Sequence, residues 1–263
     1  MISELVGYAA AIVVGVVLGL LGGGGSILSI PILVYLFNIE PALAGAYSLF
    51  IVGVTSFAGA IPKYKQQLVH LRTGVVFGLP SIVSIFLTRS FVVPAIPEEI
   101  VSIGSFLITK RLLLLGVFSI LMVLASIPMI RGKREIASES KRFRTLLVIL
   151  EGILIGFLTG LVGAGGGFLI IPALVFLTGL HFKTAVGTSL FIIGINSIAG
   201  FLGDVMQQQM DWPLLLSFTA LSILGILVGN NYARKISGIR LRMTFGWFTL
   251  VTGIYILIRE AFL

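Results

Sequence analysis

One glycine-rich pattern occurs twice in this chain, at residues 15–60 and again, at an offset of 141 positions, at residues 156–201. The two copies align without a gap. The matching residues include Gly15, Gly19, Gly22, Gly24, Gly25 and Pro31 in the first copy and Gly156, Gly160, Gly163, Gly165, Gly166 and Pro172 in the second. Several glycines in a row, each costing a helix about 1 kcal/mol relative to alanine, break a helix. The pattern therefore predicts a duplicated fold with one broken helical element in each half.

The composition places the chain in a lipid bilayer. Hydrophobic residues make up 57% of it and charged residues only 11%, and the mean hydropathy is +1.14, which lies outside the range of soluble domains. The net charge of +8 comes from basic residues in short gaps between apolar runs. This distribution indicates orientation in a membrane rather than nucleic-acid binding. The absence of cysteine excludes a disulfide scaffold and a thiolate metal site.

The apolar runs divide the chain into two similar halves. They are predicted at 5–21 with 26–37, 42–62, 73–90, 112–130, 146–163 with 167–179, 184–203, 213–232 and 243–259. A membrane-spanning helix needs about 20 residues, so the pieces 26–37 and 167–179 are predicted to be half-helices. The first run is expected to belong to the mature protein, because it recurs within the chain. We expect a first membrane repeat at 1–130, a basic cytoplasmic linker at 131–144 and a second membrane repeat at 145–263.

The distribution of basic residues predicts the topology. We assume a cytoplasmic linker and glycine-broken pairs that each enter and leave on one side, which puts 14 of the 18 Lys and Arg residues inside. Those inside are Lys63, Lys65, Arg72, Arg131, Lys133, Arg134, Lys141, Arg142, Arg144, Lys183, Arg234, Lys235, Arg240 and Arg242. The outer side holds the four remaining basic residues, Arg89, Lys110, Arg111 and Arg259, and the acidic residues Glu4, Glu40, Glu98, Glu99, Asp204, Asp211 and Glu260. If each glycine-broken pair instead crossed the membrane once, the excess of basic residues on the cytoplasmic side would largely disappear.

The predicted fold is therefore an all-α integral membrane protein of the cell membrane. It contains two inverted-topology repeats, each a glycine-broken re-entrant helical hairpin plus three transmembrane helices, and both termini are extracytoplasmic.

The two hairpin tips are the expected substrate site. Glycine permits tight turns and a close approach of backbone N–H groups to a ligand, and helices that begin at Ser26 and Phe168 would aim their positive ends at the same space. The predicted binding residues at the tips are Gly22, Gly23, Gly24, Gly25, Ser26, Gly163, Gly165, Gly166 and Gly167. The alternative is that these glycines only pack helices against one another.

Polar residues of the next element in each repeat are further candidates. The predicted ones are Ser48, Thr55, Thr188, Ser189 and Asn196, with Ser56 and Ser197 beside them. Hydroxyl and amide groups suit oxyanion oxygens. The alternative is that the hydroxyls bond back to carbonyls of their own helix.

Glu151 is the clearest ionisable residue inside an apolar segment, and it is a candidate for proton coupling. Its alternative role is to extend toward the basic linker. His70 and His181 are isolated in loops, so no metal or other cofactor is expected. No lysine follows either glycine cluster as a phosphate-binding loop requires, and no helix pairs a serine with a histidine. An enzyme is therefore not expected.

The run Gly-Leu-Leu-Gly-Gly-Gly-Gly-Ser through Pro31, its second copy from Gly160 to Pro172 and the repeated Ser-Leu-Phe at 48–50 and 189–191 resemble the sulfite exporter family TauE/SafE, also called the toluene sulfonate uptake permease family. The resemblance covers nearly the whole chain. It implies a plasma-membrane permease for sulfur-containing anions such as sulfite, sulfonates or sulfoacetate, and by analogy proton coupling. The alternatives are a non-transporting membrane subunit and a transporter of another small anion or of a metal ion.

Overall fold

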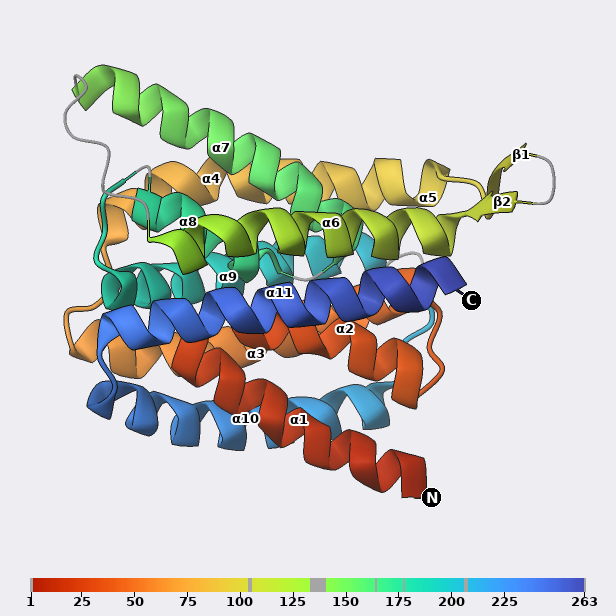
Figure 1. The fold of residues 1–263 in the computed structure, drawn as a ribbon, viewed down its shortest axis with the longest axis horizontal. Helices are drawn as coiled ribbons and strands as arrows, with labels where there is room; N and C mark the ends of the chain where they lie inside the picture. The colour runs from red at the N-terminus through yellow and green to blue at the C-terminus, as the bar shows by residue number, and fades with distance from the viewer. Residues whose placement is uncertain are drawn as a thin grey trace.

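The computed structural model describes residues 2–103, 106–132, 141–163, 165–176, 178–205 and 208–262. Long helices run side by side along the longest axis of the molecule (Figure 1). The first half contains α1 (Ile2–Leu21), α2 (Gly24–Leu36), α3 (Pro41–Lys65), α4 (Leu71–Leu87), the π-helical turn η1 (Thr88–Val92), α5 (Val93–Ala95), β1 (Glu99–Ile103), β2 (Phe106–Thr109) and α6 (Lys110–Arg131). The second half contains α7 (Lys141–Val162), α8 (Gly167–Phe176), α9 (Phe182–Val205), α10 (Trp212–Lys235) and α11 (Gly238–Phe262).

Six helices of the described chain are long and apolar enough to cross a membrane, three in each half. They are Pro41–Lys65, Leu71–Ala95, Lys110–Arg131, Phe182–Val205, Trp212–Lys235 and Gly238–Glu260. Helices α2 and α8 have 13 and 10 residues, which is too short for a full crossing. They begin at Gly24 and Gly167, one or two residues before the starts expected from the sequence. The protein is a multi-pass membrane protein built almost entirely of helices.

Local sequence explains where the spanning helices start. Glu40 caps α3 with both carboxylate oxygens, which accept from the N–H groups of Ala42 and Leu43 at 2.9 and 3.1 Å. Pro41 follows at the first helical position, where its missing N–H costs nothing. Asp211 caps α10 in the same way by accepting from the N–H of Leu214 at 3.1 Å. These acidic caps fix where the helices begin at one end of the bundle.

The two halves pack on each other with exchanged partners. Helix α1 packs on α10 and α7 packs on α4, while α3 pairs with α9 and α6 pairs with α11. Contacts between single residues show the same exchange of partners between the halves. A Cβ at Gly15 would lie 2.0 Å from the carbonyl oxygen of Ser222, and a Cβ at Gly156 would lie 2.6 Å from that of Ser81. Since Gly156 and Ser222 are the repeat equivalents of Gly15 and Ser81, the contacts obey an approximate two-fold symmetry.

The two short helices reach the middle of the molecule from opposite ends. Figure 1 shows that α1 runs inward from the end where α11 finishes, and that α2 returns to that end. Helix α7 runs inward from the opposite end, where α6 finishes, and α8 returns there. We call this second end the linker end. Residues 133–140, most of the predicted linker, lie outside the described residues, and α7 already begins at Lys141, four residues earlier than predicted.

Two features differ from the sequence-based prediction. First, β1 and β2 form an antiparallel hairpin where only a loop was expected, since β-branched residues are frequent on both sides of a Gly-Ser pair in this stretch. Second, the assignment of Arg89 and Asp204 to outer loops is wrong. Arg89 lies in η1 and Asp204 in α9, and both side chains are buried. The helices extend past the apolar runs because these two opposite charges pair inside the protein.

Candidate functional site

The two glycine turns meet in the interior. A Cβ at Gly23 would lie 2.0 Å from the carbonyl carbon of Gly167, and a Cβ at Gly167 would lie 2.2 Å from the Cα of Gly23. The backbones are therefore in direct contact where α2 and α8 begin. The first four N–H groups of a helix have no partner within it, and they carry the positive end of the helix dipole. The contact thus brings two positive helix ends together.

Left-handed backbone makes glycine necessary in both turns. The φ angle is +69° at Gly22, +78° at Gly163, +65° at Gly165 and +74° at Gly166. Two of these glycines also face serines of one long helix, α9. A Cβ at Gly22 would lie 3.1 Å from Ser189 Oγ, and a Cβ at Gly165 would lie 2.6 Å from Ser197 Oγ.

The other predicted glycines pack against helices. A Cβ at Gly25 would lie 2.4 Å from the carbonyl oxygen of Val14 in α1, and Gly24 faces side chains of the same helix. Gly163 lies against the backbone of Gly45 in α3, and Gly166 faces Thr159 in α7. The clusters therefore contain glycines that pack against helices, as the alternative expected, while ligand binding by the glycines of the turns stays a prediction.

Four buried polar atoms of α3 and α9 have no hydrogen-bond partner in the described part of the chain. They are Thr55 Oγ1, Ser56 Oγ, Asn196 Oδ1 and Ser197 Oγ. Asn196 is the repeat equivalent of Thr55, and Ser197 is that of Ser56. Leaving a buried polar group unsatisfied costs about 1–3 kcal/mol, so such groups are rare without a reason. Their recurrence at equivalent positions of two helices that pack together marks this region as the candidate site.

The remaining predicted polar residues have protein partners. Ser26 Oγ donates to the carbonyl oxygen of Gly23 at 2.6 Å, and Ser189 Oγ donates to that of Val186 at 2.8 Å. Ser48 Oγ lies 2.6 Å from Ser29 Oγ.

The four residues with unpartnered atoms, Thr55, Ser56, Asn196 and Ser197, form what we call the central cluster. Thr188 lies outside it. Its Oγ1 accepts from the N–H of His70 at 2.9 Å, and it is nine residues, about 13 Å of helix, from Ser197. Asn196 does belong to the central cluster, where its Nδ2 donates to Ser81 Oγ at 2.6 Å.

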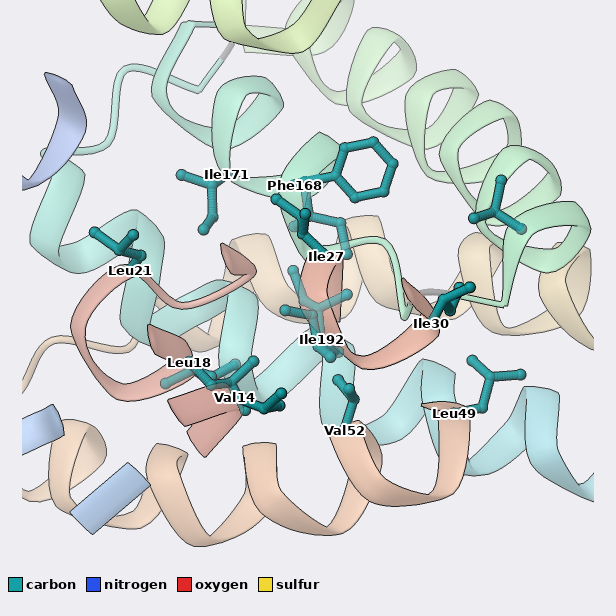
Figure 2. Packing of buried hydrophobic residues seen from close by; sticks show 14 of the residues in the cluster. Val14, Leu18, Leu21, Ile27, Ile30, Leu49, Val52, Phe168, Ile171 and Ile192 are labelled. Atoms are coloured by element: carbon teal, nitrogen blue, oxygen red, sulfur yellow. The ribbon is translucent and has the colours of Figure 1, made fainter. Parts of the chain in front are cut away.

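Apolar side chains surround the glycine turns. Ile27 of α2, Phe168 of α8, Val52 of α3 and Ile192 of α9 belong to one cluster of buried hydrophobic residues (Figure 2). All four are fully or almost fully buried. Because such buried apolar side chains exclude water, the local dielectric constant is low, and hydrogen bonds and helix dipoles act more strongly here than in water.

A buried ion pair beside the second turn was missed by sequence reasoning. Arg89 is 0% exposed. Its Nε donates to Asp204 Oδ2 at 2.7 Å, its Nη2 also contacts that oxygen, and its Nη2 donates to the carbonyl oxygen of Ala42 at 3.2 Å. Its Nη1 reaches the carbonyl oxygen of Gly160 at 3.4 Å. The π-helical turn η1 carries Arg89 to this position. The available signal was that Arg89 lies within the apolar run 73–90 and Asp204 directly follows the run 184–203.

Glu151 lies apart from these groups. It is half-buried in α7 and makes no ion pair with the described side chains. Twelve residues separate it from Gly163, which corresponds to about 18 Å along a helix. The geometry does not bring it to the glycine turns.

Comparison with known proteins gives the family. The family described as Sulfite exporter TauE/SafE matches residues 7–256. A probable membrane transporter protein of Xylella fastidiosa (strain 9a5c) is 32% identical over 98% of this chain and 96% of its own. Probable membrane transporter protein YdhB of Bacillus subtilis (strain 168) is 24% identical over 92% of this chain and 96% of its own.

A third relative is also similar over nearly the whole chain. Probable membrane transporter protein MJ0441 of Methanocaldococcus jannaschii is 26% identical over 94% of each chain. No solved structure matches the chain significantly. The six spanning helices, the family match and these relatives agree on a membrane transporter. The chain belongs to the TauE/SafE sulfite exporter family.

Proposed function

We propose that this protein is a secondary transporter of small sulfur-containing anions, such as sulfite, sulfonates or sulfoacetate, and that the anion binds where the two glycine turns meet. One observation carries the proposal. Buried polar atoms without a described partner occur at equivalent positions of α3 and α9, and one of them, Ser197 Oγ, would lie 2.6 Å from a Cβ at Gly165 of the second glycine turn. The family's description, which names a sulfite exporter, supports the substrate class.

The available groups match the chemistry of such an anion. A sulfite or sulfonate headgroup has three oxygens that accept hydrogen bonds, and the hydroxyls of Thr55, Ser56 and Ser197 can donate to them. Backbone N–H groups at the starts of α2 and α8 are further donors. Asn196 Oδ1 accepts, and so suits the proton of hydrogen sulfite. The site thus neutralises the anion with dipoles instead of a full positive charge.

The exchanged contacts of the two halves support an alternating-access mechanism. In this proposal α1–α2 and α7–α8 are re-entrant hairpins of two inverted repeats, with both termini outside the cell membrane and residues 131–144 in the cytoplasm. The bias of basic residues toward the linker end supports this orientation. Movement of one repeat against the other would open the glycine turns first to one side and then to the other.

Replacing Ser197 by alanine tests the site. Ser197 Oγ has no described protein partner, so the change should leave thermal stability in detergent the same or higher. If that hydroxyl donates to the anion, affinity should fall roughly tenfold or more, the worth of a hydrogen bond to a charged group. Binding is measured by titrating the purified protein with sulfite, sulfoacetate, taurine, sulfate and chloride, and transport by flux of the same anions into proteoliposomes.

Ser119→Ala is the matched control. Ser119 is also fully buried, but its hydroxyl donates to the carbonyl oxygen of Gly116 at 2.8 Å. Its replacement should leave anion affinity unchanged. Equal affinities of Ser197→Ala and the wild type would remove the central cluster from the binding site, and a wild type without saturable anion flux would overturn the proposed function.

Glu151 provides the test of proton coupling. If Glu151 carries the coupled proton, Glu151→Gln should abolish the stimulation of sulfite flux by an imposed pH difference. Anion affinity should not change, because Glu151 is about 18 Å of helix from Gly163. The measurement is flux into proteoliposomes with and without the pH difference. Stimulation that persists in Glu151→Gln would assign Glu151 a role at the membrane surface instead.

A further inference from the structure

Lys63 of α3 is buried without a counter-charge. The residue as a whole is only 3% exposed, and its Nζ faces other cations with no acidic partner among the residues that the structure describes. A buried charge without a partner costs several kcal/mol, so a protein keeps one where a partner arrives. Lys63 lies seven residues, or two helical turns, after Ser56 of the central cluster.

Further cations lead from Lys63 to the surface. Lys183 of α9 and Arg234 of α10 act on Lys63 electrostatically. Lys183 is half-buried and Arg234 is exposed. Lys183 Nζ donates to the carbonyl oxygen of Arg234 at 3.3 Å, which ties the two helices together. The three cations lie where α3 ends, α9 begins and α10 ends, which Figure 1 shows at the linker end of the molecule, and their exposure falls from Arg234 through Lys183 to Lys63.

A neutral polar group completes this cluster. Asn230 lies one turn before Arg234 on α10 and is 3% exposed. Its Nδ2 donates to the carbonyl oxygen of Gly59 at 3.1 Å, and its Oδ1 has no described partner. Asn230 thus belongs with Lys63 to the interface between α3 and α10.

The two-fold relation of the halves makes this arrangement informative. Lys63 is the repeat equivalent of Asp204, and Asn230 is that of Arg89. At one end of the α3–α9 pair the two positions form a closed ion pair. At the linker end the same positions hold a lysine and an asparagine, so a positive charge is left over. The charge at the first end is thus neutralised within the protein, whereas the lysine at the linker end lacks a described counter-charge and could pair with an anion.

A cavity of about 440 Å³ opens beside this cluster. Lys183, His181 and Arg242 are among the residues that line it. Arg242 Nε is buried and has no hydrogen-bond partner among the described residues. The cavity is large enough for a small oxyanion with its water, and Lys183 belongs both to its lining and to the group of cations around Lys63.

We propose that Lys63, with Lys183 and Arg234, forms a second anion site that holds the transported oxyanion between the linker end and the glycine turns. This inference rests on the proposed function. The occupant is a singly or doubly charged oxyanion of sulfite or sulfonate type. A lipid phosphate shares this chemistry, but the burial of Lys63 favours a small solute.

Lys63→Gln is the decisive variant. The Michaelis constant for sulfite presented at the linker end should rise about tenfold, the loss of one charge-assisted hydrogen bond. The constant for sulfite presented at the other end should change much less. Flux is measured in membrane vesicles of both orientations. Lys65→Gln is the matched control, since Lys65 is on the same helix but exposed, and Lys63→Arg should restore most of the affinity.

Asn230→Asp tests the site without removing the lysine. The new carboxylate would pair with Lys63 and compete with the anion, so thermal stability should rise while the Michaelis constant at the linker end also rises.

To separate a small solute from a lipid headgroup, the flux of the wild type and of Lys63→Gln is compared in vesicles of phosphatidylcholine alone and of phosphatidylcholine with phosphatidylglycerol. An effect of Lys63→Gln that requires the anionic lipid would assign the site to a headgroup and overturn the proposal.

The outcomes separate this site from the proposed function. Saturable sulfite flux in the wild type with unchanged constants in Lys63→Gln and Asn230→Asp would refute the second site alone. A wild type that neither binds nor transports any sulfur anion would refute both.

Discussion

Replacing Gly23 by alanine is expected to lower sulfite flux roughly 100-fold, since a displacement on the order of 1 Å costs about that much where function depends on geometry. The added Cβ would lie 2.0 Å from the carbonyl carbon of Gly167 and 2.3 Å from its carbonyl oxygen. Both are backbone atoms and cannot rotate away. The two turns must separate, and the N–H groups proposed to bind the anion then move apart.

The measurements are sulfite flux in proteoliposomes and sulfite affinity in detergent. Because the contact is mutual, Gly167→Ala should have the same effect. Gly78→Ala is the control, since a Cβ there meets nothing within 4 Å. It adds the same methyl group to a spanning helix and should transport normally. Wild-type affinity in Gly23→Ala, together with wild-type affinity in Gly167→Ala, would show that the anion does not bind between the turns.

The helices of this protein were largely predictable, because membrane burial imposes a simple rule. A run of about 20 apolar residues must be a helix, and consecutive glycines must interrupt it. The lengths of α2 and α8 and the grouping of three long helices in each half follow from these rules. The duplication also predicts which residues of the two halves are equivalent. It does not predict which helices touch.

The details of the candidate site were beyond sequence reasoning, because they depend on contacts between distant segments. Ser189 and Ser197 are both serines of α9, yet Ser189 bonds to its own helix and Ser197 has no described partner. No local pattern separates them. The same holds for Gly23 and Gly25, one of which meets the opposite turn while the other packs on α1.

Arg89 and Asp204 were misplaced for a related reason. A charge at the end of an apolar run resembles a loop residue when each half is considered alone. Only the packing of η1 against α9 brings the two residues together. Once paired, they can lie inside the protein, because each satisfies the charge of the other.

Asp204→Asn is expected to destabilise the protein by about 3–5 kcal/mol, because it leaves the guanidinium of Arg89 buried without a counter-charge. The reason lies in the geometry of the pair. Arg89 is 0% exposed, and its other hydrogen bonds reach only carbonyl oxygens, those of Ala42 and Gly160. Thermal unfolding of the purified protein in a mild detergent measures the loss.

Glu98→Gln is the matched control, since it also removes a carboxylate from an ion pair. Glu98 lies 3.4 Å from Lys110 Nζ, but its side chain is 77% exposed, so the change should cost about 0–1 kcal/mol. The double variant Arg89→Met with Asp204→Leu should recover most of the stability that Asp204→Asn loses, because apolar side chains of similar size replace a buried pair at little cost. If Asp204→Asn and Glu98→Gln lost equally little stability, water would have to reach Arg89 beside the second glycine turn.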